Sequence, residues 1–128
     1  MKQNKRIKPT EGELEILQIL WANGPSSVRF VNEKLNEIRE VGYTTTLKIM
    51  QIMAGKDLVV RNTESRTHIY QAFINEEATQ KQLLQKFVDS TFRGSAMKMV
   101  MQALGNHEAS NQELEEIKAL IEKMEKKD

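Results

Sequence analysis

Cysteine is absent from this chain, histidine is scarce, and long hydrophobic runs are missing. The lack of cysteine among 128 residues excludes disulfides, thiolate metal sites and a cysteine nucleophile, and it suits a reducing compartment. No apolar run approaches the roughly 20 residues of a membrane-spanning helix. The lysine-rich start also lacks the apolar stretch of a signal peptide. We therefore expect a cytoplasmic protein without membrane insertion.

The chain also holds few groups suited to catalysis. Its 2 histidines, His68 and His107, are far apart in sequence. There is no glycine-rich phosphate loop and no nucleophile elbow. The Asn-His-Glu motif at 106–108 lies in an expected loop and would need ligands from elsewhere to hold a metal. The sequence thus predicts no enzyme, no metal site and no cofactor.

Charge is distributed unevenly along the chain. Residues 1–74 carry eleven lysines and arginines against eight acidic residues, whereas residues 75–128 carry eight against ten. The first eight residues hold four basic side chains, including Lys5 and Arg6, and no acid. Such an arm either binds the phosphates of a nucleic acid or is a solvated tail.

Two helices are predicted in the first forty residues. In "TEGELEILQILWANGP", Thr10 and Glu13 form a capping box, and Gly24-Pro25 ends the helix. "SSVRFVNEKLNEIRE" restarts with Ser26 or Ser27 as N-cap. Its expected apolar face consists of Val28, Val31, Leu35 and Ile38. Because only a few residues separate the helices, they must turn sharply on each other.

A third helix is predicted in "VGYTTTLKIMQIMAG", with a buried and a polar face. The buried face is expected to hold Thr46, Ile49, Met50 and Met53, at helical spacing. The polar face holds Thr44, Thr45, Lys48 and Gln51, with Leu47 at its margin. Three helices with short connections and a polar outer face on the third are typical of a helix-turn-helix.

The periodicity then changes from helix to strand. Two β-rich runs, 58–61 and 67–73, flank the polar turn "NTESR" and predict a hairpin, or wing, that carries Arg61 and Arg66. His68 falls within the second run, where we expect a packing or hydrogen-bonding residue. A hairpin after the third helix makes a winged helix-turn-helix.

Residues 75–128 show only helical patterns. Leu84, Phe87 and Val88 share one face, and Met101 and Leu104 lie in "AMKMVMQAL". A last helix opens with a second capping box, Ser110 and Glu113, and repeats apolar residues as in a coiled-coil seam: Leu114, Ile117, Ile121 and Met124. Because short isolated helices are marginal in water, we expect a homodimer held by this region. The expected fold is mainly α with a small β-hairpin wing, a winged-helix domain over 1–74 and a helical dimerisation domain over 75–128.

The polar face of the third helix suits the major groove of DNA. Threonine hydroxyls can bond base edges or phosphates, and Lys48 can bond a guanine or a phosphate. Gln51 can bond an adenine edge, and Leu47 can contact a thymine methyl. The full set of expected DNA-binding residues is Lys5, Arg6, Ser27, Thr44, Thr45, Leu47, Lys48, Gln51, Arg61 and Arg66. In the alternative interpretation, Thr44 only caps the helix while Lys48 and Gln51 are ordinary surface residues.

Two rival functions share this fold. A winged-helix module can dock a protein partner through its charged face instead of binding specific DNA. A nonspecific architectural DNA binder is a second rival, and the small basic arm argues against it. Phosphate contacts predict a steep loss of affinity with salt, which separates DNA binding from protein docking.

The order of elements, with "YTTTLKIMQIM", "DLVVRNTESRTHIYQA" and "FRGSAMKMVMQAL", resembles the BlaI/MecI/CopY family of bacterial transcriptional repressors over about residues 11–121. This resemblance implies a winged-helix domain and a dimerisation domain. It also implies a homodimer that binds a dyad-symmetric DNA operator and represses antibiotic-resistance or stress-response genes. Many members are inactivated by cleavage triggered by a membrane sensor protease.

The chain departs from the family pattern at three places. The usual Asn-Phe scissile bond corresponds here to Gln102–Ala103, which disagrees with the usual cleavage specificity. The cysteine-rich tail of the copper-responsive branch is absent, which argues against copper sensing. The Lys-Gly turn usual before the first wing strand reads Lys56-Asp57, with the glycine at Gly55.

Overall fold

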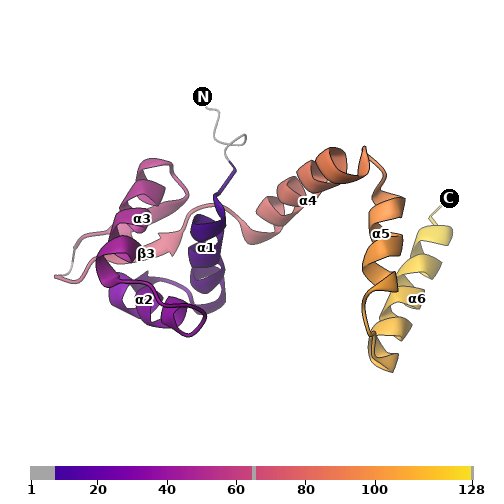
Figure 1. The fold of residues 1–128 in the computed structure, drawn as a ribbon, viewed down its shortest axis with the longest axis horizontal. Helices are drawn as coiled ribbons and strands as arrows, with labels where there is room; N and C mark the ends of the chain where they lie inside the picture. Colours follow the sequence, from indigo (N-terminus) through magenta and orange to yellow (C-terminus); the bar gives the residue numbers. More distant parts are fainter. Residues whose placement is uncertain (1–7, 65, 128) are drawn as a thin grey trace. The chain divides into compact units, whose positions relative to one another are not determined.

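The computed structural model describes residues 8–64 and 66–127 (Figure 1). These residues fall into two compact units, divided between Leu83 and Leu84. The elements in chain order are α1 (Glu11–Asn23), β1 (Ser26–Ser27), α2 (Val28–Asn36), α3 (Tyr43–Gly55), β2 (Val59–Asn62), β3 (Ile69–Ala72), α4 (Glu76–Phe92), α5 (Ala96–Gly105) and α6 (Asn111–Glu125). A mainly helical chain with a small antiparallel sheet confirms the predicted fold class.

Helix α1 begins and ends as its sequence predicts. The Glu13 backbone N–H donates to Thr10 Oγ1 at 3.1 Å, and the Thr10 N–H donates to Glu13 Oε1 at 2.9 Å. Gly24 follows the helix with φ 82°, a conformation that glycine adopts without a steric penalty. The helix buries Ile16, Leu17 and Leu20.

Helix α2 is shorter than its apolar pattern suggests. Of the two predicted candidates, Ser26 and Ser27, it is Ser27 that is the N-cap, and its side chain accepts a bond from Phe30 N–H at 3.1 Å. The helix ends at Asn36, whose side chain bonds both the N–H and the C=O of Val41. This local bonding turns the chain away, so Ile38 lies outside the helix and is 66% exposed. Its placement on the buried face was therefore wrong.

The start of α3 excludes a capping role for Thr44. Gly42 is the N-cap and makes no side-chain bond to the helix, which leaves Thr44 exposed in the first turn. The buried face of α3 contains Thr46, Met50 and Met53, as predicted. The Thr46 hydroxyl is satisfied because its Oγ1 accepts from Asn32 Nδ2 at 2.8 Å and donates to Gly42 O.

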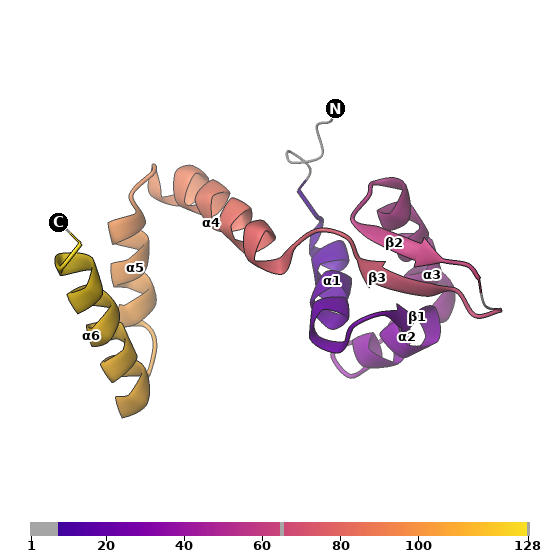
Figure 2. The same cartoon turned by 180° about the vertical axis from the view of Figure 1, so that it is seen from behind.

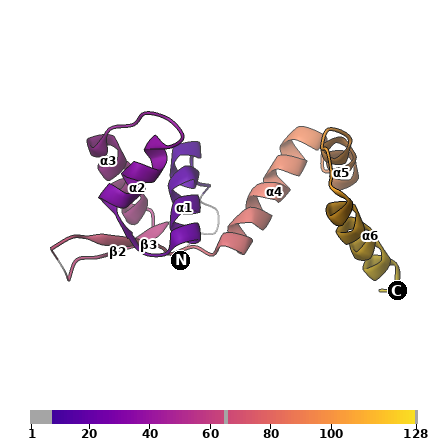
Figure 3. The same cartoon turned by 90° about the horizontal axis from the view of Figure 1, so that it is seen from below.

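A three-stranded antiparallel sheet of order β1-β3-β2 completes the first unit (Figure 2). The hairpin is confirmed, and it extends beyond helices α1–α3 (Figure 3). Strand β3 starts at Ile69, so His68 precedes it and is exposed. Of the two expected roles, packing or hydrogen bonding within the strand, the packing role and the position in the strand were therefore wrong.

The core of the first unit lies between α1, α2, α3 and the sheet. It is closed by Tyr70, which is 1% exposed, and by Leu58 and Val59. Trp21 packs against this core, and its indole N–H donates to Ile74 O at 3.1 Å. The three helices and the wing are thus held together as one scaffold.

The second unit carries many exposed apolar side chains. Its helix starts match the sequence patterns, because Ser95 caps α5 and Ser110 with Glu113 makes the second capping box. Helices α5 and α6 bury no residue in the single chain. Among residues 8–64 and 66–127, no helix is long and apolar enough to cross a membrane.

Candidate nucleic-acid interface

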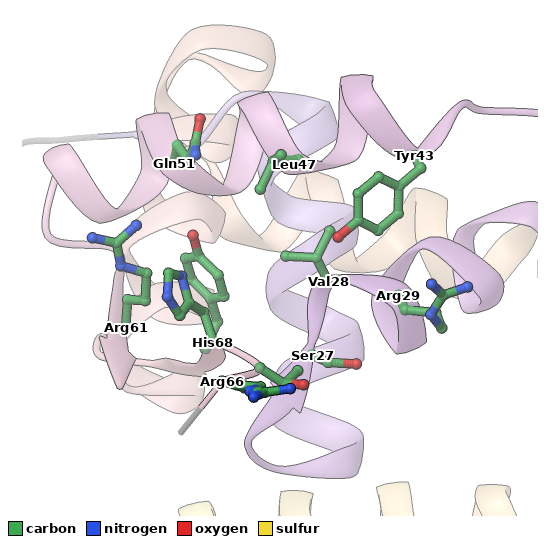
Figure 4. Close-up of a pocket in the computed structure, with 11 residues that line it drawn as sticks. Ser27, Val28, Arg29, Tyr43, Leu47, Gln51, Arg61, Arg66 and His68 are labelled. Carbon is green, nitrogen blue, oxygen red and sulfur yellow. The ribbon is translucent and has the colours of Figure 1, made fainter. Parts of the chain in front are cut away.

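A cleft of about 460 Å³ lies between α2, α3 and the wing (Figure 4). Its floor contains the buried side chains of Val28 and Tyr70. The other lining residues are Ser27, Arg29, Tyr43, Leu47, Gln51, Arg61, Arg66, Thr67 and His68. Five of the predicted DNA-binding residues, Ser27, Leu47, Gln51, Arg61 and Arg66, are therefore brought together.

Helix α3 contributes one stripe of side chains to this cleft. Tyr43, Leu47 and Gln51 recur every four residues and so share one side of the helix. Thr44 and Lys48 each lie one position further on and are exposed outside the cleft. The third threonine, Thr45, is also exposed and outside it. These side chains present hydroxyls and an ammonium group to solvent beside the cleft.

The wing contributes positive charge to the cleft. Figure 4 shows Arg61 and His68 on the side of Gln51, whereas Tyr43 lies toward the other end of α3. Arg66 enters from the segment between the strands. Arg29, from the first turn of α2, adds a third guanidinium. A lining with three arginines and no carboxylate among the described residues attracts anions such as phosphates.

The Ser27 hydroxyl lies where α2 begins. It accepts the Phe30 N–H and also lines the cleft. The positive end of the helix dipole therefore faces the same space as the arginines, which favours negative charge there.

Four polar residues that line the cleft were not among the predicted DNA-binding residues: Arg29, Tyr43, Thr67 and His68. Arg29 and Tyr43 each lie in the first turn of a helix, and this position beside Ser27 and Thr44 was the available signal. His68 was misplaced because the predicted strand began two residues too early, at Thr67 instead of Ile69. The predicted contacts of Lys5 and Arg6 lie outside the described residues.

The second histidine lies in the other unit. His107 Nε2 is 3.2 Å from Glu113 Oε1, and the Ser110 backbone N–H donates to the same carboxylate. The Ser110 bond, together with His107, holds the pKa of Glu113 below its usual value. Within 8–64 and 66–127, no group of three or more histidine, aspartate or glutamate side chains could hold a metal ion.

Comparison with solved structures supports the fold of the first unit. The solution structure of the DNA binding domain of the repressor BlaI matches with a TM-score of 0.51 and 20% sequence identity. The match covers 61% of this chain and 93% of that one. At this level of identity, the likeness establishes a shared winged-helix fold.

Sequence comparisons cover nearly the whole chain. The penicillinase repressor of Staphylococcus aureus is 20% identical over 124 residues, which are 97% of this chain and 98% of that protein. The transcriptional regulator BlaI of Mycobacterium tuberculosis is 37% identical over 62 residues, 46% of this chain and 45% of that protein.

The family model for the penicillinase repressor matches residues 9–123. This family consists of transcriptional repressors and not of enzymes, which confirms the expectation that the chain is not an enzyme. The family resemblance drawn from the sequence motifs is also confirmed. The chain belongs to the penicillinase repressor family.

Proposed function

We propose that this chain, a DNA-binding transcriptional repressor by its family, acts in the cytoplasm as a homodimer on a dyad-symmetric operator. The observation that carries the proposal is the arginine-lined cleft beside the exposed outer face of α3. One face can read bases in the major groove while the cleft holds the adjacent phosphates. Antibiotic-resistance or stress-response genes are the expected targets.

The outer face of α3 has the chemistry of base readout. Lys48 and Gln51 are exposed and can bond guanine and adenine edges, respectively. Thr44 and Thr45 are exposed in the first turns, where recognition helices meet bases. Leu47, at the margin of the cleft, can contact a thymine methyl.

The phosphate contacts come from the elements around α3. Arg61 and Arg66 of the wing and Ser27 at the start of α2 line the cleft. Lys5 and Arg6 of the basic arm add positive charge to the same domain. These contacts give affinity with little sequence information.

The dimerisation domain, residues 75–128, supplies the contact between subunits. Leu84, Phe87, Met101, Leu104, Leu114 and Ile121 are exposed in the single chain, and Ile117 is half-buried. Exposed apolar side chains in such number are typical of an interaction surface. Val88 differs, since it is already buried within the single chain. The winged-helix domain of residues 1–74 then presents one α3 to each half-site.

A membrane sensor protease system is the proposed partner that relieves repression, with Gln102–Ala103 as the bond cleaved. Both residues are exposed in α5. Helix α5 must unwind locally before a protease can bind that bond in extended form. Immunoblots of cells treated with a β-lactam test this step: a shortened chain supports it, and an intact chain after full induction contradicts it.

Footprinting on the DNA upstream of the gene tests the repressor proposal. We expect two protected half-sites with dyad symmetry, which lie about one helical turn, or a multiple of it, apart. Protein docking without specific DNA binding is the alternative. It predicts no footprint and no steep dependence on salt, whereas each neutralised phosphate adds about −0.9 to the log–log salt slope.

A further inference from the structure

We infer that His68 is a proton-dependent phosphate contact, so that operator binding takes up a proton and strengthens as the pH falls. The inference rests on the proposed function and assigns a form of regulation to the same site. His68 is exposed just before β3 and lines the cleft that Arg61 and Arg66 also line.

The charged and titratable groups that line the cleft together with His68 come from every element around it. Arg61 comes from β2, Arg66 from the turn, Arg29 from α2, Tyr43 from α3 and Tyr70 from β3. None of these described lining groups is a carboxylate. A protonated imidazole therefore has no anionic partner among the lining residues. A DNA phosphate held in the cleft is the negative group that favours the protonated ring.

Histidine is the side chain suited to such a response near neutral pH. Its unperturbed form titrates near pH 6.5, whereas arginine stays charged throughout the physiological range. With a neutral His68 ring, the lining presents three cations to the phosphates, and with a protonated ring it presents four. The change of one charge alters both the affinity for DNA and its dependence on salt.

The test is fluorescence anisotropy of full-length protein with operator DNA at about pH 6 and about pH 8, over a series of salt concentrations. Binding per subunit is expected to be about two- to fivefold tighter at the lower pH, the effect of one exposed charge contact. The log–log salt slope should also steepen by about 0.9 per subunit at the lower pH. If the His68 ring had a purely structural role, the number of phosphates neutralised, and so the salt slope, would be the same at both pH values.

Three variants isolate the residue. His68→Gln should lose the pH dependence and keep the shallower salt slope at both pH values. The His68→Arg variant should bind the operator tightly at both pH values, because the arginine stays charged at both. His107→Gln is the matched control, since the other histidine lies in the second unit beside Glu113, and it should keep the wild-type pH dependence. Circular dichroism checks that each variant is folded.

The outcomes separate this inference from the proposed function. If His68→Gln binds the operator and keeps the full wild-type pH dependence, the inference is overturned while the repressor proposal stands. A wild-type protein that binds equally at both pH values overturns it as well. If the wild-type chain binds no DNA at either pH, the proposed function fails and the inference fails with it.

Discussion

Glu13 and Lys56 form an ion pair that links the first turn of α1 to the end of α3. Lys56 Nζ is 2.8 Å from Glu13 Oε2, and the Glu13 residue is only 4% exposed. Burial alone would raise the pKa of Glu13. The hydrogen bonds from Lys56 and from the Thr10 N–H outweigh burial and hold that pKa below its usual 4.5. The pair fixes the helix that carries the proposed base-reading residues.

Stability should therefore decrease in acid partly through Glu13. Because its pKa is lower in the folded state, its contribution is complete above pH 4.5 and is lost as the pH falls below that value. Glu13→Gln should cost about 1–2 kcal/mol at neutral pH, measured by urea unfolding. The difference in the free energy of unfolding between Glu13→Gln and the wild type should become smaller in acid.

The control for this variant is Glu15→Gln. Glu15 pairs with Arg39 at 2.7 Å on the surface, where water screens the charges, so Glu15→Gln should cost less stability than Glu13→Gln. An equal cost for both variants would show that burial of the Glu13 pair contributes nothing extra.

Loss of the Lys48 ammonium should weaken specific binding. Lys48 is exposed on the outer face of α3, so Lys48→Ala should cost about 1–3 kcal/mol on the operator if it reads a base. Anisotropy titration with operator and scrambled DNA measures the change. Lys86→Ala, on the exposed surface of α4, is the control. Wild-type affinity and preference in Lys48→Ala would remove this residue from the site.

Polar substitution on α6 should yield monomers. Leu114 and Ile121 are exposed in the single chain, and replacing both with glutamate places charges in the proposed seam. Light scattering should then show a monomer that binds half-sites poorly. Ile38→Glu, at a similarly exposed residue of the first unit, should remain dimeric. A dimeric double variant would place the interface elsewhere, such as at Leu84 and Phe87.

Asp57 holds a backbone conformation that favours glycine. Its φ is 64°, in the left-handed region, where the family pattern has glycine. Asp57→Gly should therefore stabilise the fold by about 0.5–1 kcal/mol in thermal unfolding. Gly24→Ala is the opposite control, because Gly24 has φ 82° and should lose stability. A loss of stability in Asp57→Gly would show that its side chain matters more than its φ.

Features set by neighbouring residues were predictable from the sequence. Both capping boxes, the Ser27 cap and the buried face of α3 depend on residues within a few positions of each other. The wing also forms despite the departure at Lys56-Asp57, because Asp57 itself adopts the positive φ.

Features set by distant residues were not predictable. Strand β1 has two residues, shows no alternation, and exists because Ser26 pairs with Tyr70. The cleft likewise brings Arg29 to the wing, although the two are separated by the whole of α3. The exposure of Ile38 has a local cause that the apolar spacing of α2 does not show, because the Asn36 side chain bonds Val41 and ends the helix first.

The most direct test of the account is fluorescence anisotropy with DNA from upstream of the gene and a scrambled duplex, each at two salt concentrations. The account predicts tight, salt-sensitive binding to the native fragment and far weaker binding to the scrambled one. Failure to bind either duplex at low salt would contradict it and favour a protein-docking function for the same fold.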